Sequence, residues 1–297
     1  MIESVQLLAP AKINLWLRVL ARETSGYHSL ETLFAAASLF DRLEVSRMGN
    51  PGVVLEVTGD EDTGPVEKNL VYRAATAFLS QAGNADGVRI RLEKSIPSAG
   101  GLGGGSSDAA ATLRGLSELF AGAVPPSEML RIAANLGSDV PFFLAASPLA
   151  LGWGRGERLL ALNPLPKRHI LIAHPGVPMP TGDAFRRLVE LRETSAAPAA
   201  QALELADLGS WPAIAQLAAN DFELPAFERI PRLSAAKDCL FECGAEVALL
   251  AGSGASIFGI FDSLAELEPA AVELERQGWR CWREHTLDAW PPSSPRH

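Results

Sequence analysis

The sequence predicts an α+β protein built from two packed units, and three observations lead to this fold class. The chain has 297 residues, and single hydrophobic cores rarely grow beyond about 250–300 residues. Strand-like and helix-like patterns alternate along it without an internal repeat or a low-complexity tract. Finally, 47% of the residues are apolar and 21% are charged, which is typical of a globular protein and not of a disordered chain or a membrane bundle.

In the first unit, the clearest strand pattern runs from Ala11 to Val19. Apolar residues occupy every second position there, and Lys12, Asn14 and Arg18 lie between them, so one face of the strand is apolar. The same reasoning predicts short strands at residues 43–45, 53–57 and 88–92, and helices at residues 69–81 and 106–120.

A domain boundary is expected at residues 162–168, where two prolines and two basic residues interrupt the apolar pattern. This divides the chain into residues 1–162 and residues 163–297. In the second unit, strands are expected at 169–173, 247–251, 256–261 and 279–284, and helices at 182–193, 234–243 and 264–277, with a loose Ala/Pro-rich connector at 194–200. This order indicates antiparallel strands with helices on one face.

Composition and charge exclude several classes of function. The 26 Lys and Arg residues against 35 Asp and Glu residues give a net charge of −9, which argues against nucleic acid as a partner but leaves room for a small anionic ligand. Cys239, Cys243 and Cys281 are too few and too clustered for a disulfide framework or a four-ligand zinc site. With no signal-peptide pattern and no uncharged stretch of about 20 residues, we expect a cytoplasmic protein without a membrane partner.

The strongest chemical signal is a glycine-rich loop between a predicted strand and a predicted helix. Five glycines occupy the six positions from Gly100 to Gly105, so the backbone is free to adopt positive φ and to approach a ligand closely. Its amides and the positive end of the following helix would form an anion site. No Lys-Ser/Thr pair follows, as a Walker loop requires, and Ser106 stands where the dinucleotide fingerprint needs its third glycine. The alternative is a plain turn in which Ser106, Ser107 or Asp108 caps the helix.

Three other candidates are weaker when each is taken alone. Lys12 and Asn14 share one face of a strand and could serve an anion and a hydroxyl, although a solvated outer face is the simpler interpretation. Asp139, in Gly137-Ser138-Asp139-Val140-Pro141, fits either a helix boundary or a general base. The loop at residues 252–256 is a hairpin turn by default, and by hypothesis it forms a wall of backbone donors.

Taken together, these residues resemble the GHMP kinase superfamily of small-molecule kinases. The superfamily's three signatures correspond here to residues 9–15, 97–107 and 250–256. Four further segments favour the branch of the superfamily that acts on 4-diphosphocytidyl-2-C-methyl-D-erythritol, and they lie at residues 26–33, 103–107, 137–143 and 154–157. The resemblance extends over nearly the whole chain.

The resemblance implies a two-domain GHMP kinase fold, with a ribosomal-protein-like N-terminal domain that has a left-handed βαβ crossover and a ferredoxin-like C-terminal domain. It also implies ATP-dependent phosphorylation of the substrate's 2-hydroxyl in non-mevalonate isoprenoid biosynthesis. Asp139 would be the base, and Lys12 would hold it ionised and offset charge on the attacking oxygen. The residues implied to cradle the ATP phosphates, with Mg²⁺, are Pro97, Ser98, Ala99, Gly100, Gly101, Leu102, Gly103, Gly104, Gly105, Ser106 and Ser107.

The resemblance assigns the remaining site residues to the substrate. Cytosine would stack between the rings of Tyr27, His28 and Phe185, and Asn14 and Thr181 would contact the hydroxyl and phosphate region. The expected partners are this substrate and ATP, with the protein a monomer or a weak homodimer. Two alternatives remain: another GHMP kinase, acting on mevalonate or homoserine, and a non-catalytic nucleotide-binding module.

Overall fold

The structure is a computed structural model that describes residues 2–22, 28–59, 64–83, 86–179, 181–192 and 203–296. Its strands are β1 (Ser4–Arg22), β2 (His28–Met48), β3 (Val53–Thr58), β4 (Gly87–Glu93), β5 (Leu149–Gly154), β6 (Arg158–Ala161), β7 (His169–His174), β8 (Ala219–Asn220), β9 (Val247–Leu250), β10 (Ile257–Phe261), β11 (Arg280–His285) and β12 (Ser294–Arg296). The α-helices are α1 (Leu70–Ala82), α2 (Gly104–Leu119), α3 (Pro126–Leu136), α4 (Thr181–Arg192), α5 (Trp211–Leu217), α6 (Glu223–Arg229), α7 (Arg232–Glu242) and α8 (Leu264–Arg276). Short 3₁₀ helices lie at η1 (Val66–Lys68), η2 (Val140–Leu144) and η3 (Leu205–Leu208).

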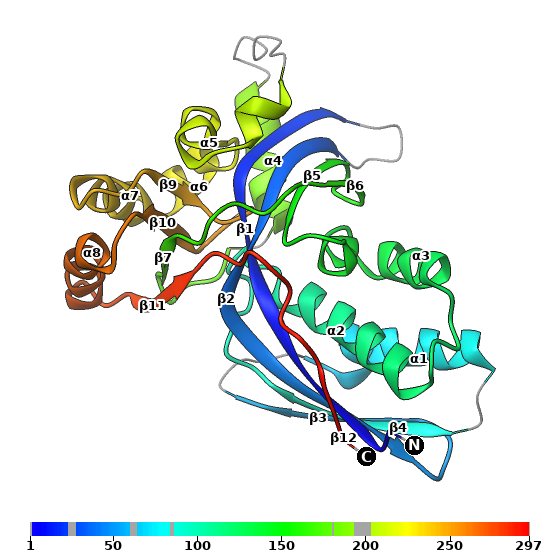
Figure 1. The fold of residues 1–297 in the computed structure, drawn as a ribbon. Coiled ribbons are helices and arrows are strands. Elements are labelled where there is room, and N and C mark those ends of the chain that lie inside the picture. The colour runs from blue at the N-terminus through cyan, green and yellow to red at the C-terminus, as the bar shows by residue number, and fades with distance from the viewer. Residues whose placement is uncertain are drawn as a thin grey trace.

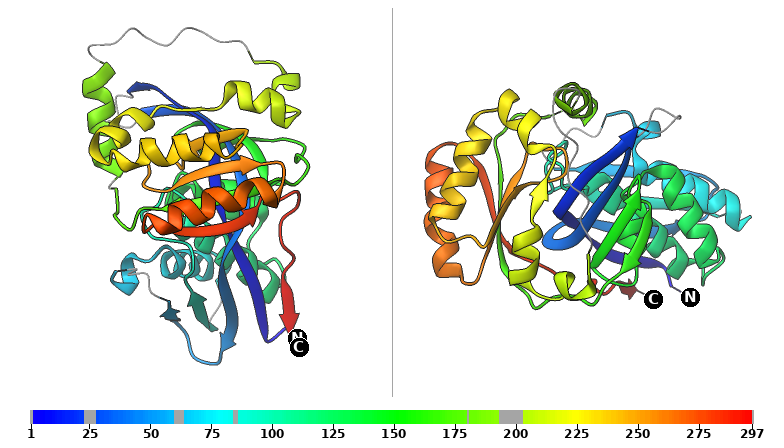
Figure 2. Two further views of the ribbon diagram at one scale, coloured as in Figure 1. Left: turned by 90° about the vertical axis from the view of Figure 1, so that its left-hand side faces the viewer. Right: turned by 90° about the horizontal axis from the view of Figure 1, so that it is seen from above.

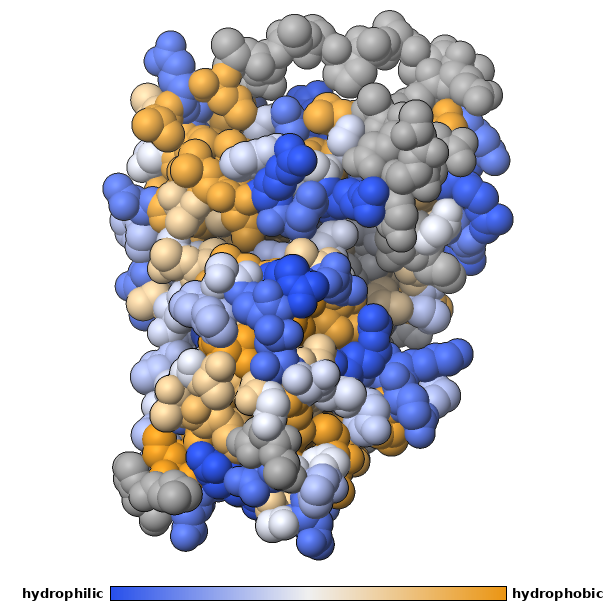
Figure 3. All heavy atoms as spheres, turned by 90° about the vertical axis from the view of Figure 1, so that its right-hand side faces the viewer, coloured by the Kyte–Doolittle hydropathy of each residue, from blue (hydrophilic) through white to orange (hydrophobic). Residues whose placement is uncertain are grey.

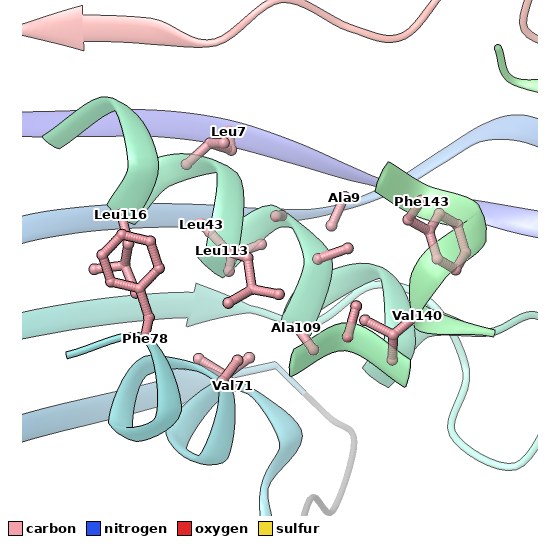
Figure 4. Close-up of a cluster of buried hydrophobic side chains, with 14 of the residues drawn as sticks. Leu7, Ala9, Leu43, Val71, Phe78, Ala109, Leu113, Leu116, Val140 and Phe143 are labelled. Carbon is pink, nitrogen blue, oxygen red and sulfur yellow. The ribbon is translucent and has the colours of Figure 1, made fainter. Parts of the chain in front are cut away.

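The first sheet has the order β12-β1-β2-β4-β3, with β5 and β6 continuing from β2, and β8 beside β1. Helices α1, α2 and α3 lie together against this sheet (Figure 1). The core between them is visible in Figure 4, where Phe78 of α1 and Leu113 and Leu116 of α2 gather beneath the strands. Strands β3 and β4 pair in parallel and are joined through α1, which makes a βαβ unit.

Helices α1 and α2 lie close to their expected positions, and capping residues mark both ends of α1. The side chain of Asn69 accepts a hydrogen bond of 2.9 Å from the amide of Val71 at the start of α1, and Gly83 ends that helix in the left-handed conformation, with φ of 62°. The helices expected at residues 69–81 and 106–120 are confirmed, because α1 and α2 differ from them by only one or two residues at each end.

A long antiparallel pair, β1 and β2, runs through the molecule and links its two halves. The strands have 19 and 21 residues, and their pairing shifts register at three places, the first between Pro10 and Ala11. The short strands expected at residues 11–19 and 43–45 are therefore wrong in length. In the middle of β2, residues 33–37 are buried in succession, so this stretch has no polar alternation that could mark it as a strand.

The second sheet has the order β11-β7-β10-β9 and every pair in it is antiparallel. The expected strands and helices of this half are confirmed to within two residues at each end, and the 194–200 connector lies outside the described residues. With its four strands numbered along the chain, the order is 4-1-3-2, as in a ferredoxin-like domain. Helices α7 and α8 cover one face of the sheet (Figures 1 and 2).

The opposite face of the second sheet packs on β1 and β2, which places a core between the two sheets. Ile257 and Phe261 of β10 belong to the cluster beneath the helices, whereas Phe258 and Ile260 belong to the cluster with Ile13. The α+β fold with two sheets is thus confirmed. The domain boundary at residues 162/163 stays a prediction, and two strands from beyond it, β8 and β12, join the first sheet.

The surface agrees with the composition. On the face shown in Figure 3, hydrophilic and hydrophobic residues are interspersed, as on most globular proteins. Among the described residues, every helix is too short or too polar to cross a lipid bilayer.

Candidate active site

A cavity of about 990 Å³ lies where the long strands, the glycine-rich loop and the second half of the chain meet. Strands β1 and β2, the loop before α2, helix α4 and the turn between β9 and β10 all contribute to its lining. A cavity of this size is large enough for a nucleotide and a second small molecule. Every residue from Pro97 to Ser106 lines it, while Ser107 is buried in the first turn of α2 with an exposed fraction of 1%.

The glycine-rich loop has the backbone geometry of an anion site. Helix α2 begins at Gly104, and Gly103 caps it in the left-handed region with φ of 71°. The amides of the first turn and the positive end of the helix dipole therefore belong to the part of the chain that lines the cavity. Because Gly103 is the cap residue, Ser106, Ser107 and Asp108 lie inside the helix, so the alternative in which one of them caps it is wrong.

Glycine is required at the loop because another backbone segment lies directly against it. A Cβ atom on Gly101, where φ is 79°, would lie 1.8 Å from the carbonyl oxygen of Ala251. The amide of Ser256 donates to the carbonyl of Gly100 at 3.1 Å. Residues 251–256, which we call the Gly252 turn, thus lie against the glycine-rich loop, and Gly252 and Ser253 of this turn line the cavity. The hairpin expected there is confirmed, because β9 and β10 pair antiparallel on either side of the turn.

Lys12 and Asn14 face the cavity and not solvent. Their exposed fractions are 4% and 2%, so the interpretation as a solvated outer face is wrong, because Gly103 and Asp139 of the first half and Gly252 of the second lie against that side of β1. The ammonium of Lys12 donates to Oδ1 of Asn14 at 2.7 Å. Nδ2 of Asn14 donates to Oγ1 of Thr32 at 2.7 Å, and that hydroxyl donates to the carbonyl of Trp16 at 2.8 Å. This chain of hydrogen bonds fixes the position of the Lys12 ammonium.

Asp139 completes the polar end of the cavity. It stands at the N-cap position of η2, but its side chain makes no cap hydrogen bond. Instead Oδ2 lies 3.4 Å from Nζ of Lys12, and the carboxylate keeps 32% of its side-chain surface exposed. A carboxylate that is accessible from the cavity and paired with a buried lysine is suited to accept a proton from a hydroxyl.

Aromatic rings line the other end of the cavity. The ring of His28 stacks on that of Phe185 in α4, with centroids 5.3 Å apart and planes 23° apart. Phe185 meets Phe222 edge to face at 4.7 Å, and all three residues line the cavity. Thr181 is the first residue of α4, but its side chain, like the whole of Tyr27, lies outside the described part of the chain.

Comparison with known proteins identifies the family. The chain matches the GHMP kinases N terminal domain over residues 69–147 and the GHMP kinases C terminal domain over residues 199–280. A protein of Geobacter sp. (strain M21) named 4-diphosphocytidyl-2-C-methyl-D-erythritol kinase is 35% identical over 278 residues, which cover 93% of this chain and 97% of that protein. The chain belongs to this kinase family.

Two further members of the 4-diphosphocytidyl-2-C-methyl-D-erythritol kinase family agree with this assignment. The protein of that name from Deinococcus radiodurans is 39% identical over 282 residues, covering 91% of this chain and 89% of that protein. A crystal structure of 4-(cytidine 5'-diphospho)-2C-methyl-D-erythritol kinase superposes with a TM-score of 0.78 and 37% identity, covering 95% of this chain and 98% of that chain. Sequence and fold therefore give the same family.

Sequence reasoning missed a buried group of charges behind the glycine-rich loop of this family member. The ammonium of Lys94 bonds to Oδ2 of Asp41 and, at 2.7 Å, to Oδ2 of Asp108. Oδ1 of Asp41 also accepts the amides of Ser95 and Ile96 at 2.6 and 2.9 Å. Asp41 therefore binds the chain where it enters the loop, and Asp108 in α2 is tied to the same lysine where the chain leaves it.

Because two carboxylates share one ammonium, this group carries a surplus of negative charge when both are ionised. Asp108 is 2% exposed, and burial, the largest effect, raises its pKa to about 8, although Lys94 opposes this. Burial also lowers the pKa of Lys94, but the two carboxylates outweigh it and raise that pKa above its usual value. The interactions therefore favour a proton on Asp108 at neutral pH.

The raised pKa of Asp108 leads to a prediction about stability. Between about pH 4 and pH 8 the folded kinase holds a proton that the unfolded chain releases, so its free energy of unfolding falls as the pH rises, by up to about 1.4 kcal/mol per pH unit. Asp108→Asn carries no titrating proton, so its stability is expected to fall less steeply. Urea unfolding of both proteins across this pH range, without ligand, measures the difference. Parallel profiles would contradict the assignment of the proton to Asp108.

Proposed function

We propose that the protein is an ATP-dependent kinase that phosphorylates the 2-hydroxyl of 4-diphosphocytidyl-2-C-methyl-D-erythritol, as part of isoprenoid biosynthesis by the non-mevalonate route. One observation carries the proposal: the glycine-rich loop at residues 97–107, which we now call the phosphate loop, lines a single cavity with the Lys12–Asp139 pair and the His28–Phe185 stack. A phosphate donor, a hydroxyl acceptor and a pyrimidine ring each have a matching part of the lining. Family membership supports the same activity.

The chemistry follows from the positions of the two charged side chains. The phosphate loop and the start of α2 hold the phosphates of ATP with backbone amides. Asp139 takes the proton of the acceptor hydroxyl, which makes the oxygen a better nucleophile toward the γ-phosphorus. Lys12 lies beside it and offsets the negative charge that gathers on that oxygen and on the transferred phosphoryl group. Phosphoryl transfer needs little else from a protein than such positioning and charge.

Mg²⁺ is the metal that we propose for this site, and the residues present fit it. Within the described part of the chain, no cluster of three or more His, Cys, Asp or Glu side chains could hold a metal ion. Mg²⁺ does not need one, because it is ordinarily held by one or two protein oxygens together with phosphates and water. Ser106 lines the cavity, and its hydroxyl would hold the ion together with the phosphates and water, which leaves Asp139 to act as the base. When bound, the ion would neutralise charge on the phosphate oxygens.

The experiment that tests the function is ADP release with Mg²⁺-ATP, supplying in turn 4-diphosphocytidyl-2-C-methyl-D-erythritol, mevalonate and homoserine. Turnover on the cytidine compound alone is expected. Turnover on mevalonate or homoserine instead would keep a GHMP kinase and discard the proposed substrate. ATP binding without turnover on any acceptor would contradict the catalytic role and favour a nucleotide-binding module.

A second prediction concerns the pyrimidine end of the cavity. His28→Ala removes the ring that stacks on Phe185, so the KM for the cytidine substrate is expected to rise by about three- to tenfold, as for the loss of one stacking contact. The KM for ATP is expected to stay unchanged, since the phosphate loop lies at the other end. Initial rates with each substrate varied in turn measure both constants. An unchanged KM for the cytidine substrate would count against cytosine binding at His28.

A further inference from the structure

A short segment, residues 220–223, joins three parts of the site that lie far apart in the sequence. It follows α5 and includes the end of β8, which pairs in parallel with β1 at Leu17. The amide of Asp221 donates to the carbonyl of Leu17 at 3.0 Å. The segment is therefore attached to the same strand that carries Lys12 and Asn14.

Asn220 uses its side chain as a clamp on the Gly252 turn. Its Nδ2 donates to the carbonyl of Leu250 at 2.8 Å and to the carbonyl of Gly252 at 2.7 Å. Its Oδ1 accepts the amide of Phe222 at 2.9 Å. The side chain is buried, with 6% of the residue exposed, so water cannot readily replace these bonds if they are lost.

The Gly252 turn, which Asn220 holds by these hydrogen bonds, lies directly against both the phosphate loop and Lys12. A Cβ atom on Gly252 would lie 2.9 Å from the carbonyl oxygen of Gly101 and 3.1 Å from Nζ of Lys12. The backbone of Gly252 thus lies close to the ammonium of Lys12 and limits where that group can move. Since Asn220 donates a hydrogen bond to the Gly252 carbonyl, it determines where the Gly252 backbone lies and therefore how far the Lys12 ammonium can move.

Phe222 belongs to the same segment, but it contacts the aromatic end of the cavity. It is 2% exposed and supports Phe185 edge to face, and Phe185 in turn stacks on His28. Glu223 adds a further tie, because its Oε1 accepts the amide of Leu250 at 3.1 Å and its Oε2 accepts the ammonium of Lys237 at 2.7 Å. One tetrapeptide is therefore bonded to the phosphate side and packed against the aromatic side.

We propose that Asn220 and Phe222 are positioning residues that set the two ends of the active site separately. Asn220 places the Gly252 turn against the phosphate loop and Lys12, and Phe222 holds the Phe185 ring in place for the base of the substrate. This inference rests on the proposed function for the identity of the acceptor. The expected effect of Asn220 on ATP binding does not depend on which acceptor the enzyme uses.

The test compares Asn220→Asp with the wild-type protein. Aspartate keeps an oxygen for the Phe222 amide but loses both donors to the Leu250 and Gly252 carbonyls, so the turn is expected to shift. We expect kcat to fall by about 10²-fold, as for a misplaced catalytic group, and ATP affinity to fall by about tenfold. The affinity for CDP, which probes the aromatic end, is expected to stay within about twofold.

Two further variants separate positioning from a loss of folding. Asn135→Asp makes the same change on the exposed surface of α3 and is the matched control, expected to behave as wild type. Gly252→Ala displaces the same turn by contact with Gly101 and Lys12, and it should reproduce the fall in kcat and in ATP affinity. If Asn220→Asp fails to fold, kcat and ATP affinity are measured on Gly252→Ala instead. Wild-type kcat and ATP affinity in a folded Asn220→Asp or Gly252→Ala protein would overturn the inference.

Phe222→Leu should affect the other ligand, lowering the affinity for CDP and not the affinity for ATP. Loss of the edge-to-face contact is expected to weaken CDP binding by about three- to tenfold while ATP affinity stays at the wild-type value. If Phe222→Leu and Asn220→Asp lowered both affinities in the same proportion, the segment would have a general structural role and the inference would fail. Absence of turnover by the wild-type protein would refute only the proposed acceptor, because the ATP and CDP affinities still decide between these outcomes.

Discussion

Asp139→Asn is expected to lower kcat by about 10²–10⁴-fold, the usual contribution of a general base. Asparagine has nearly the same shape as aspartate, but its amide cannot take the proton of the acceptor hydroxyl. Lys12 also loses the carboxylate that lies 3.4 Å from its ammonium. ATP binding is expected to persist, because the phosphate loop supplies backbone amides that the substitution leaves in place. Steady-state turnover and calorimetric titration with ATP measure the two effects.

The matched control for this variant is Asp238→Asn, which makes the same change at an exposed aspartate of α7 and should retain wild-type turnover. If Asp139→Asn also turned over at a rate close to that of the wild type, Asp139 would not be the base. Its role would then be limited to the ion pair with Lys12.

The second large effect is expected from Gly101→Ala. The added methyl group would lie 1.8 Å from the carbonyl oxygen of Ala251, in a residue whose φ is 79°. Either the phosphate loop or the Gly252 turn must therefore move, at a cost of about 1–3 kcal/mol in stability. A displacement of this size in either wall should lower turnover by about 10²-fold. Thermal unfolding and ADP release on the same preparation measure both consequences.

Gly122→Ala separates the clash from the backbone strain. Gly122 has a similar φ of 74°, but a Cβ atom there would meet nothing within 4 Å. It is expected to lose about 1 kcal/mol of stability from positive φ alone and to keep its activity. Equal losses of activity in the two variants would show that the close contact between loop and turn is unimportant.

The local signals of the sequence were sufficient for much of the fold. The second half has short strands bounded by turn residues and helices with clear caps, such as Ser263 and Glu266 in a capping box at the start of α8, and these were placed within two residues. The middle of β2 was missed because both of its faces are buried, which removes alternation. Helix α3 and strands β5 and β6 were also missed.

The candidate site divides in the same way. That the glycine-rich loop faces a cavity could be predicted, because its composition is unusual within one short window. The Asp41–Lys94–Asp108 group and the Asn220 clamp could not, because their partners are separated by 53, 14, 30 and 32 residues. A charged or amide residue at the end of a strand, such as Lys94 or Asn220, is typical of a solvated turn, and only the folded chain shows which carbonyl or carboxylate its side chain contacts.

The length of β1 makes the accuracy of strand pairing a condition for catalysis. Lys12 lies opposite Ala36 in mid-strand, and side chains alternate between the two faces of a strand. A one-residue insertion between Ala11 and Lys12 that slipped the pairing would turn the lysine to the other face and carry Asn14 with it. The other face packs against the second sheet in the apolar cluster that contains Ile13, where a lysine and an asparagine would be buried without polar partners. The apolar core between the sheets therefore enforces the same register that turns Lys12, the cation proposed for phosphoryl transfer, toward the cavity.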